Sequence, residues 1–466
     1  MVSIIVASIV AQAPSPIELG RTLELKNDLP GALAAYQRAV EADPRDAVAL
    51  DKLGFVLGRL GRVEEAVAAF AKATELEPQL FDAHYHLGAT RWWTRDLTGA
   101  LEPLRTAVRL RPKHAEARYY FGLTLVQVDR RREGIEQLQR AVELNPSLAP
   151  AHLQLGVALQ REGDFDGAVL HLQRAVDLDH GAPETLNSLG LALMAKGDGQ
   201  KAAAVFRRIA AAYPQFPTAR LNLATALMHQ GDLASAVDIL RALTRDEPRN
   251  AEAFYNLGVA LKQQDRFEEA ETALRRALEL DSSLPDPPFT LGVVLWQSAR
   301  AEEAEALFRE AIKRKPDSAE AHYMRGTVLK QLGRVNEALE EFRTATQMNN
   351  EMAEAFLSLA QTLQQQGDEA GSKSARAEAE RLSQRKADAQ ASAFALSAGQ
   401  ERLKKGDRPG AIAQFREAVR LDGTNARAHF ALALVLEQIG ATVEARRHFG
   451  EAHRLSPYLV RPEKKR

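Results

Sequence analysis

The stretch Ala251–Leu284 reads AEAFYNLGVALKQQDRFEEAETALRRALELDSSL and predicts a hairpin of two amphipathic helices. Its first half places one face of a helix at the i, i+3, i+4, i+7 spacing, in Phe254, Leu257, Gly258 and Leu261. The second half repeats this pattern in Phe267, Ala270, Leu274, Ala277 and Leu278. Gln264 and Asp265 mark the turn between the helices. The small residues Gly258 and Ala270 let the two helices approach closely.

The same pattern returns every 34 residues along most of the chain. With Ala251 as position one, the eighth position is occupied by Gly20, Gly54, Gly88, Gly122, Gly156, Gly190, Ala224, Gly258, Gly292, Gly326 and Ala360. The twentieth is occupied by Ala32, Ala66, Ala100, Gly134, Ala168, Ala202, Ala236, Ala270, Ala304, Ala338 and Ser372. Proline closes most of these intervals, as Pro44, Pro78, Pro112, Pro146, Pro214, Pro248 and Pro316. A helical hairpin is therefore repeated in one register.

This series resembles the tetratricopeptide repeat family, whose unit is a 34-residue helix–turn–helix with small residues at fixed positions. The resemblance extends from about Ala13 to about Leu459, in thirteen units. It implies an all-α fold, a right-handed superhelical solenoid of stacked helix–turn–helix repeats. It also implies that the first helix of each unit lines the concave side of the solenoid.

The register divides the chain into segments. Residues 13–386 hold units one to eleven, residues 392–459 hold units twelve and thirteen, and residues 387–391 are a slip or linker between them. Unit eleven is degenerate, because its second helix carries polar residues where the other units have leucine or phenylalanine. We expect a long, mostly exposed helix from about Glu369 into the 380s. Residues 460–466 form a short basic tail.

The N-terminal segment 1–12 contains an uncharged apolar run, Val2–Ala11, which has the length of a signal-peptide core and is too short to span a bilayer. Small residues follow the run, but no lysine or arginine precedes it. Two interpretations stay open. The run is a cleaved signal of an exported protein, periplasmic or extracellular, which we favour, or it is an extension that packs on the first repeat of a cytoplasmic protein.

Composition excludes several classes of chemistry. The net charge of −1 gives no bulk attraction to nucleic acid or to an anionic membrane. The absence of cysteine excludes disulfides, thiol catalysis and cysteine-bound metals, and no glycine-rich phosphate loop is present. Histidines recur at position four, where we expect packing residues rather than ligands: His84, His152, His322 and His429. We therefore predict no enzyme, no cofactor, no metal site and no membrane span.

Helical geometry predicts which residues face the concave groove. Positions five and twelve are seven residues apart, hence about 20° apart around the helix, and lie roughly a quarter-turn from the packing stripe. All three tryptophans of the chain fall at position twelve or thirteen. We predict two exposed aromatic patches that bind peptide, one made of Tyr85, Trp92, Trp93 and Tyr119 and the other of Tyr255, Phe289, Trp296 and Tyr323.

The predicted function is that of a non-catalytic protein–protein interaction scaffold, which binds an extended or helical peptide segment of a partner protein in its concave groove. The alternative is a structural assembly factor of an envelope or secretion complex, which uses its convex face and its ends. The carboxylate-clamp members of the family carry asparagine at position nine. Here that position holds Phe55, Ala89, Leu123, Val157 and Leu191, so the clamp is absent.

Overall fold

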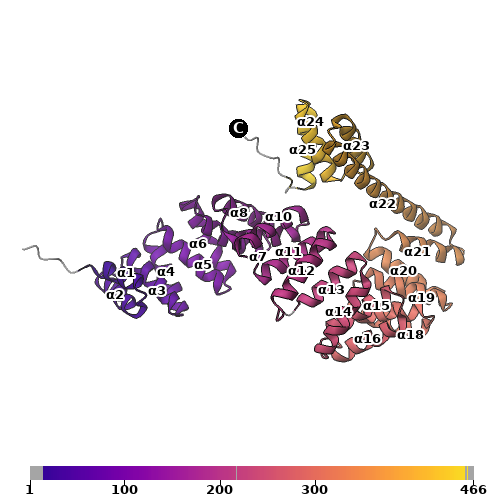
Figure 1. Ribbon diagram of the computed structural model, residues 1–466, viewed down its shortest axis with the longest axis horizontal. Helices are drawn as coiled ribbons and strands as arrows, with labels where there is room; N and C mark the ends of the chain where they lie inside the picture. Colours follow the sequence, from indigo (N-terminus) through magenta and orange to yellow (C-terminus); the bar gives the residue numbers. More distant parts are fainter. Residues whose placement is uncertain (1–13, 217, 457–458, 460–466) are drawn as a thin grey trace, which may run out of the picture. The chain divides into compact units, whose positions relative to one another are not determined.

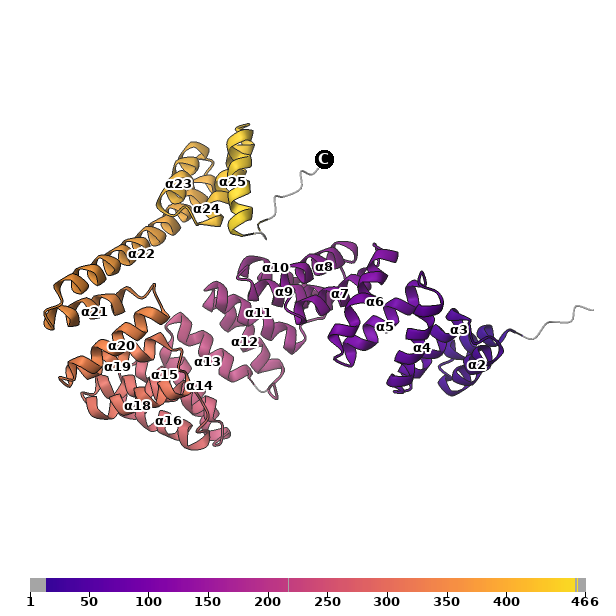
Figure 2. The same cartoon turned by 180° about the vertical axis from the view of Figure 1, so that it is seen from behind.

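The computed structural model of the chain describes residues 14–216, 218–456 and 459. The predicted signal segment lies outside these residues. The described part forms 25 helices and no strand (Figures 1 and 2). The prediction of an all-α solenoid of stacked helix–turn–helix repeats is confirmed. The chain divides into two compact units, residues 1–230 and residues 231–466.

The first unit contains thirteen helices. They are α1 (Pro16–Leu25), α2 (Leu29–Ala42), α3 (Ala47–Arg59), α4 (Val63–Leu76), α5 (Phe81–Trp93), α6 (Leu97–Leu110), α7 (Ala115–Gln127), α8 (Arg131–Leu144), α9 (Ala149–Arg161), α10 (Phe165–Leu178), α11 (Pro183–Lys196), α12 (Gly199–Ala212) and α13 (Ala219–Gln230). From α1 to α12 they form hairpins of consecutive helices, and each hairpin packs on the next. In this unit the odd-numbered helices are the first helices of the repeats.

The second unit contains the remaining helices. They are α14 (Leu233–Asp246), α15 (Ala251–Gln263), α16 (Phe267–Leu280), α17 (Pro287–Gln297), α18 (Ala301–Arg314), α19 (Ala319–Gln331), α20 (Val335–Met348), α21 (Ala353–Gln365), α22 (Glu369–Lys404), α23 (Arg408–Leu421), α24 (Ala426–Gln438) and α25 (Thr442–Leu455). Each helix from α14 onward packs on the next one along the chain.

The hairpin α15–α16 shows why the repeated residues produce this fold. Asp265 adopts a left-handed backbone conformation with φ of 57°, and so forms the turn. A Cβ atom at Gly258 would lie 2.5 Å from Cγ of Leu274 and 3.2 Å from the carbonyl oxygen of Ala270. Leu274 and Ala270 are fully buried. Glycine at position eight is therefore required by close helix contact, as the sequence predicts.

The helix α22 is longer than predicted. It spans 36 residues, Glu369–Lys404, and serves both as the second helix of unit eleven and as the first helix of unit twelve (Figures 1 and 2). Residues 387–391, predicted as a slip or linker, lie inside this helix, and Gln384 donates a hydrogen bond to Asp388 across their boundary. The stretch contains no glycine or proline that would end a helix, so the slip is accommodated without a break.

No helix among the described residues is both long enough and apolar enough to cross a membrane. The described residues also contain no group of three or more histidine, aspartate or glutamate side chains placed to hold a metal ion.

Candidate functional site

The first predicted patch lies on two neighbouring first helices of the N-terminal unit. Tyr85, Trp92 and Trp93 belong to α5, and Tyr119 belongs to α7. Trp93 is 68% exposed, whereas Tyr85, Trp92 and Tyr119 are half-buried. The four rings are therefore not equally available to a partner, and Trp93 is the one that projects into solvent.

A fifth ring, that of Tyr120, connects the patch, although Tyr120 was not among the predicted site residues. Tyr120 lies with its ring centroid 5.5 Å from Trp92, 5.1 Å from Tyr119 and 6.1 Å from Tyr85. Trp92 and Trp93 are themselves 5.1 Å apart and edge to face. The signal in the sequence was the adjacent pair Tyr119 and Tyr120 at positions five and six. The structure thus joins all four predicted rings into one aromatic cluster through Tyr120.

A hollow of about 480 Å³ opens beside Trp93, between repeats two and three. Its apolar walls come from α3, the following α4 and α5, and include Phe55, Val63, Phe70, Tyr85 and Trp93. We call this feature the apolar hollow. Its walls offer the aromatic contacts that anchor partner side chains.

Two tyrosines of the cluster, Tyr85 and Tyr119, stay neutral at physiological pH. Burial raises the pKa of Tyr119 to about 12, with a further contribution from Tyr120. Burial likewise raises the pKa of Tyr85. The indole Nε1 of Trp92 is buried and has no hydrogen-bond partner within the described residues. The cluster therefore presents aromatic surface rather than acid–base chemistry.

The second predicted patch is not one cluster. Phe289 lies 5.7 Å from Phe308 and Tyr323 lies 6.1 Å from Phe342, so each of these two rings contacts a ring of its own repeat. The Trp296 indole instead donates a hydrogen bond of 2.9 Å to Gln331. The fourth predicted residue, Tyr255, is half-buried. Among the described rings, no aromatic contact joins any two of these four residues. These residues line successive first helices without forming the predicted patch.

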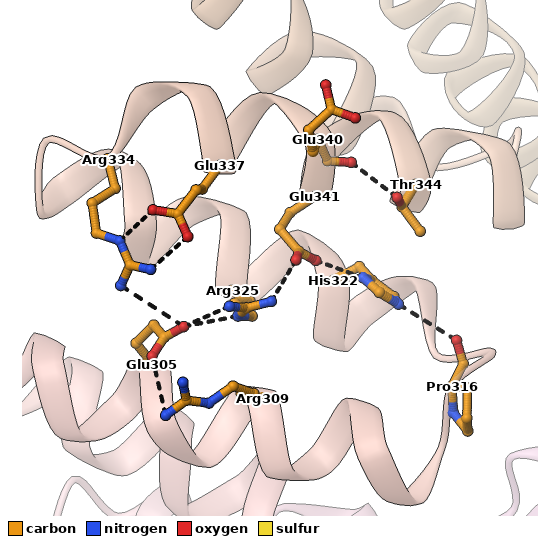
Figure 3. Close-up of polar contacts among 10 residues, drawn as sticks. All are labelled: Glu305, Arg309, Pro316, His322, Arg325, Arg334, Glu337, Glu340, Glu341 and Thr344. Carbon is orange, nitrogen blue, oxygen red and sulfur yellow. Dashed lines mark hydrogen bonds and ion pairs between the residues drawn. The ribbon is translucent and has the colours of Figure 1, made fainter.

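The second unit contains a buried ion-pair network, shown in Figure 3. Arg325 donates to Glu305 at 2.8 and 2.9 Å and to Glu341 at 2.6 Å. His322 Nδ1 lies 2.5 Å from the other oxygen of Glu341, and Arg334 approaches Glu305 at 3.9 Å. The side chains of Glu305, Arg325 and Glu341 are 7%, 18% and 14% exposed. The network joins α18, α19 and α20.

This network has a structural explanation. Arg325 occupies position seven, where neighbouring repeats have Leu257, Leu291 and Leu359. A guanidinium in that packing stripe requires compensating carboxylates, because an unpaired buried charge is strongly destabilising. Glu305 and Glu341 supply them from the two adjacent second helices. The network therefore fixes how the helices pack, and no separate ligand is needed to explain it.

The histidines at position four are buried or half-buried, as predicted for packing residues. In three repeats the ring Nε2 contacts a carbonyl oxygen of the turn that precedes its helix: His84 with Pro78 at 3.1 Å, His322 with Pro316 at 3.4 Å and His429 with Gly423 at 3.2 Å. In two repeats the ring also contacts a second histidine, as in His152 with His171 at 3.0 Å and His429 with His448 at 2.9 Å.

Comparison with known protein families agrees with the repeated geometry. Models described as tetratricopeptide repeat or TPR repeat match residues 59–92, 119–183, 193–258, 251–284, 289–353, 323–388 and 399–440. Together these matches cover more than half of the chain. The chain belongs to the tetratricopeptide repeat family. This membership places it in a class of protein–protein interaction scaffolds.

Solved structures with a similar arrangement include other proteins of this family, whereas no curated protein matches the chain. MamA from Desulfovibrio magneticus RS-1 is 27% identical and matches 36% of this chain and 95% of its own, with a TM-score of 0.34. YrrB, described as a TPR protein with an unusual peptide-binding site, is 25% identical over 40% of this chain and 95% of its own, with a TM-score of 0.37. Yeast Tom70 is 15% identical over 95% of this chain and 91% of its own, with a TM-score of 0.37.

Proposed function

We propose that this protein is a scaffold without catalytic activity of its own, and that it binds a peptide segment of a partner protein on the first helices of repeats two to four. The observation that carries the proposal is the exposed ring of Trp93 beside the apolar hollow. Trp93 is 68% exposed at the edge of this hollow, so its ring and the apolar walls are open to a ligand together. It suits the anchoring of a partner side chain.

The aromatic cluster supports this proposal by holding Trp93 in place. The Trp92 ring contacts both Trp93 and Tyr120. Tyr85 belongs to the cluster and also lines the apolar hollow. Aromatic side chains lose little conformational entropy when a ligand binds, because they have only two rotatable bonds and are held by their neighbours. A ligand side chain would therefore enter a site that is already formed.

The second set of rings has a smaller part in this proposal. Tyr255, Phe289, Trp296 and Tyr323 lie on successive first helices of the second unit, α15, α17 and α19. They offer separate contacts rather than one patch. We propose that they add affinity for a long ligand and do not form a second anchor.

A selection from displayed random peptides tests the proposal. Peptides that bind the wild-type protein are recovered and then tested against Trp93→Ala and Phe55→Ala, which remove the exposed ring and one wall of the apolar hollow. Phe394→Ala is the matched control, because Phe394 is 78% exposed but lies on α22, outside the candidate site. We expect both groove variants to lose the enriched peptides and Phe394→Ala to keep them.

The opposite pattern favours the assembly-factor alternative. If no peptide requires Trp93, while natural partners still bind the folded Trp93→Ala protein, then the convex face or the ends make the contacts. That result would contradict groove binding directly, because the variant removes a solvent-exposed ring without disturbing the core.

A further inference from the structure

We propose that the groove of repeats one to three recognises an acidic peptide segment, in which a carboxylate side chain lies next to an apolar anchor residue. In this proposal Arg59 and His86 contact the carboxylate, and the apolar hollow receives the anchor. The inference rests on the proposed function and specifies the chemistry of its ligand.

A second hollow continues the apolar hollow across the first helices. It has a volume of about 890 Å³ and is lined by residues of α1, α3 and α5. The two hollows share three lining residues, Phe55, Arg59 and His86. We call the place where they meet the seam. A ligand that lies in both hollows must pass over the seam, so the charges there decide which ligands bind.

A buried carboxylate orients the imidazole of the seam. His86 Nδ1 lies 2.7 Å from Asp51 Oδ1, and Asp51 is only 1% exposed. The second oxygen of Asp51 accepts a hydrogen bond of 3.2 Å from Lys52. The His86 ring is also held between Phe55 and Tyr85, at 5.3 and 5.6 Å. Asp51 is one of the few buried charged residues in the described part of the chain, and it orients His86 at the seam.

The Asp51 contact determines what His86 offers to a ligand. Because Nδ1 faces the buried Asp51 carboxylate, Nε2 is the ring nitrogen that is left for a ligand. Among the described residues, Nε2 has no hydrogen-bond partner. Nε2 is therefore the nitrogen of His86 that a ligand at the seam can contact.

Other groups around the seam favour the same ligand. The Arg59 guanidinium donates to the neutral amide of Asn27 at 2.7 Å, and it makes no ion pair within the described residues. The second hollow is lined by three cations, Arg21, Lys52 and Arg59, and by two carboxylates, Glu24 and Asp82. Glu24 accepts from the Tyr36 hydroxyl at 2.9 Å and keeps its charge. The other, Asp82, faces Arg111 at 3.4 Å. The third nearby carboxylate, Asp51, is buried under His86. The seam thus presents donors and cations, and a carboxylate complements them better than an amine does.

The spacing of the helices fits a short extended segment. The first helices α3 and α5 pack on each other, and packed helices lie about 8–10 Å apart. An extended chain advances about 3.3 Å per residue, so about three residues would cover the step from α3 to α5. A carboxylate at the seam and an apolar side chain in the next hollow would then be close in the ligand sequence.

A double-mutant cycle between ligand and protein tests the inference. The probe is a peptide selected from the displayed random library, together with its analogue in which glutamine or asparagine replaces the acidic residue. Both are titrated into wild type, Arg59→Gln and His86→Gln. Arg381→Gln is the control, because Arg381 is exposed on α22 and pairs with Glu378 there. We expect the amide analogue to bind wild type and Arg381→Gln about tenfold more weakly than the acidic peptide does. In Arg59→Gln and in His86→Gln the difference between the two peptides should be smaller, because each variant removes one of the two contacts to the carboxylate.

Asp51→Asn extends the cycle to the residue that positions His86. It should weaken binding of the acidic peptide and leave binding of the amide analogue unchanged, whereas a merely structural role would weaken both. If His86→Gln does not fold, the comparison of the acidic peptide with its amide analogue in Arg59→Gln tests the inference. Selected peptides that carry no acid, or an acid whose replacement costs the same affinity in every variant, would overturn the inference. If peptide binding still required Trp93, such a result would overturn the inference about the acidic residue but not the proposed function.

Discussion

The rings of Trp92 and Tyr120 meet edge to face with centroids 5.5 Å apart, joining the first helices α5 and α7 of adjacent repeats. Trp92 also packs on the buried side chains of Leu104, Phe121 and Leu125. Trp93, its neighbour in sequence, is mostly exposed. Two adjacent tryptophans therefore have different roles: Trp92 stabilises the stacking of repeats, and Trp93 is available to a ligand.

This difference predicts opposite effects of two similar substitutions. Trp92→Ala should lower the free energy of unfolding by about 2–4 kcal/mol, because it leaves a cavity between α5 and α7. Trp93→Ala should change it by less than about 0.5 kcal/mol. Chemical denaturation followed by circular dichroism measures both values. Equal losses of stability in the two variants would show that Trp93 is also a packing residue.

A second prediction concerns the ion-pair network of the second unit. Arg325→Leu restores the leucine found at position seven of neighbouring repeats, yet it leaves Glu305 and Glu341 buried without their main counter-charge. We expect a loss of stability of about 3–5 kcal/mol, seen as faster hydrogen exchange in α19 and α20. Adding Glu305→Val and Glu341→Ala should recover most of the loss. A single Arg325→Leu variant that is as stable as wild type would contradict this explanation.

A third prediction concerns pH. Burial, followed by the proximity of His152, lowers the pKa of His171 to about 4 from its ordinary value of 6.5. As pH falls from about 6.5 towards 4, the unfolded protein takes up a proton at His171 that the folded protein does not. The folded state is therefore most stable above the unfolded-state pKa and loses stability over this pH range. The wild type should therefore be about 2 kcal/mol less stable at pH 5 than at pH 7.5 from this group alone.

The control for this pH effect is His171→Gln. Glutamine occupies the equivalent position in the preceding repeat, as Gln137, and it can still donate a hydrogen bond to His152. Denaturation at the two pH values should show a smaller acid-induced loss of stability in the variant than in the wild type. The same loss in both proteins would mean that His171 does not sense pH.

A fourth prediction concerns α22. Residues 383–390 in the middle of this helix are exposed except for the half-buried Asp388, so little tertiary packing protects them. Trypsin should cut first at Arg385 or Lys386, after local unfolding of the helix. Mass spectrometry of the fragments should then identify units one to eleven and units twelve to thirteen as separate pieces, in agreement with the predicted domain boundary. First cuts within α3 to α20 would contradict it.

The repeated hairpins could be predicted from the sequence because each one depends on local spacing and on a few small residues. Gly258 is an example, since its closeness to Leu274 follows from a pattern that recurs along the chain. The continuity of α22 could not be predicted in the same way. A five-residue slip shows that the register changes, but only the absence of a helix-ending residue explains why the chain does not turn there.

The candidate site was predictable only in part. Counting positions identified Trp93 and Tyr85 as residues of a first-helix surface, but it could not show that Tyr120 connects them, because that contact crosses between repeats. The Asp51–His86 pair was missed for the same reason: the two residues are 35 positions apart and form a pair only when repeats two and three stack. Contacts between repeats depend on side-chain packing that residue spacing does not record.

The most direct test of the central claim is the affinity of a selected peptide for Trp93→Ala, measured by isothermal titration beside wild type and Phe394→Ala. We expect at least about a tenfold loss of affinity in Trp93→Ala, with an unchanged melting temperature. We expect no loss in Phe394→Ala. Equal affinity of all three folded proteins for every selected peptide would contradict the claim that these first helices form the binding site.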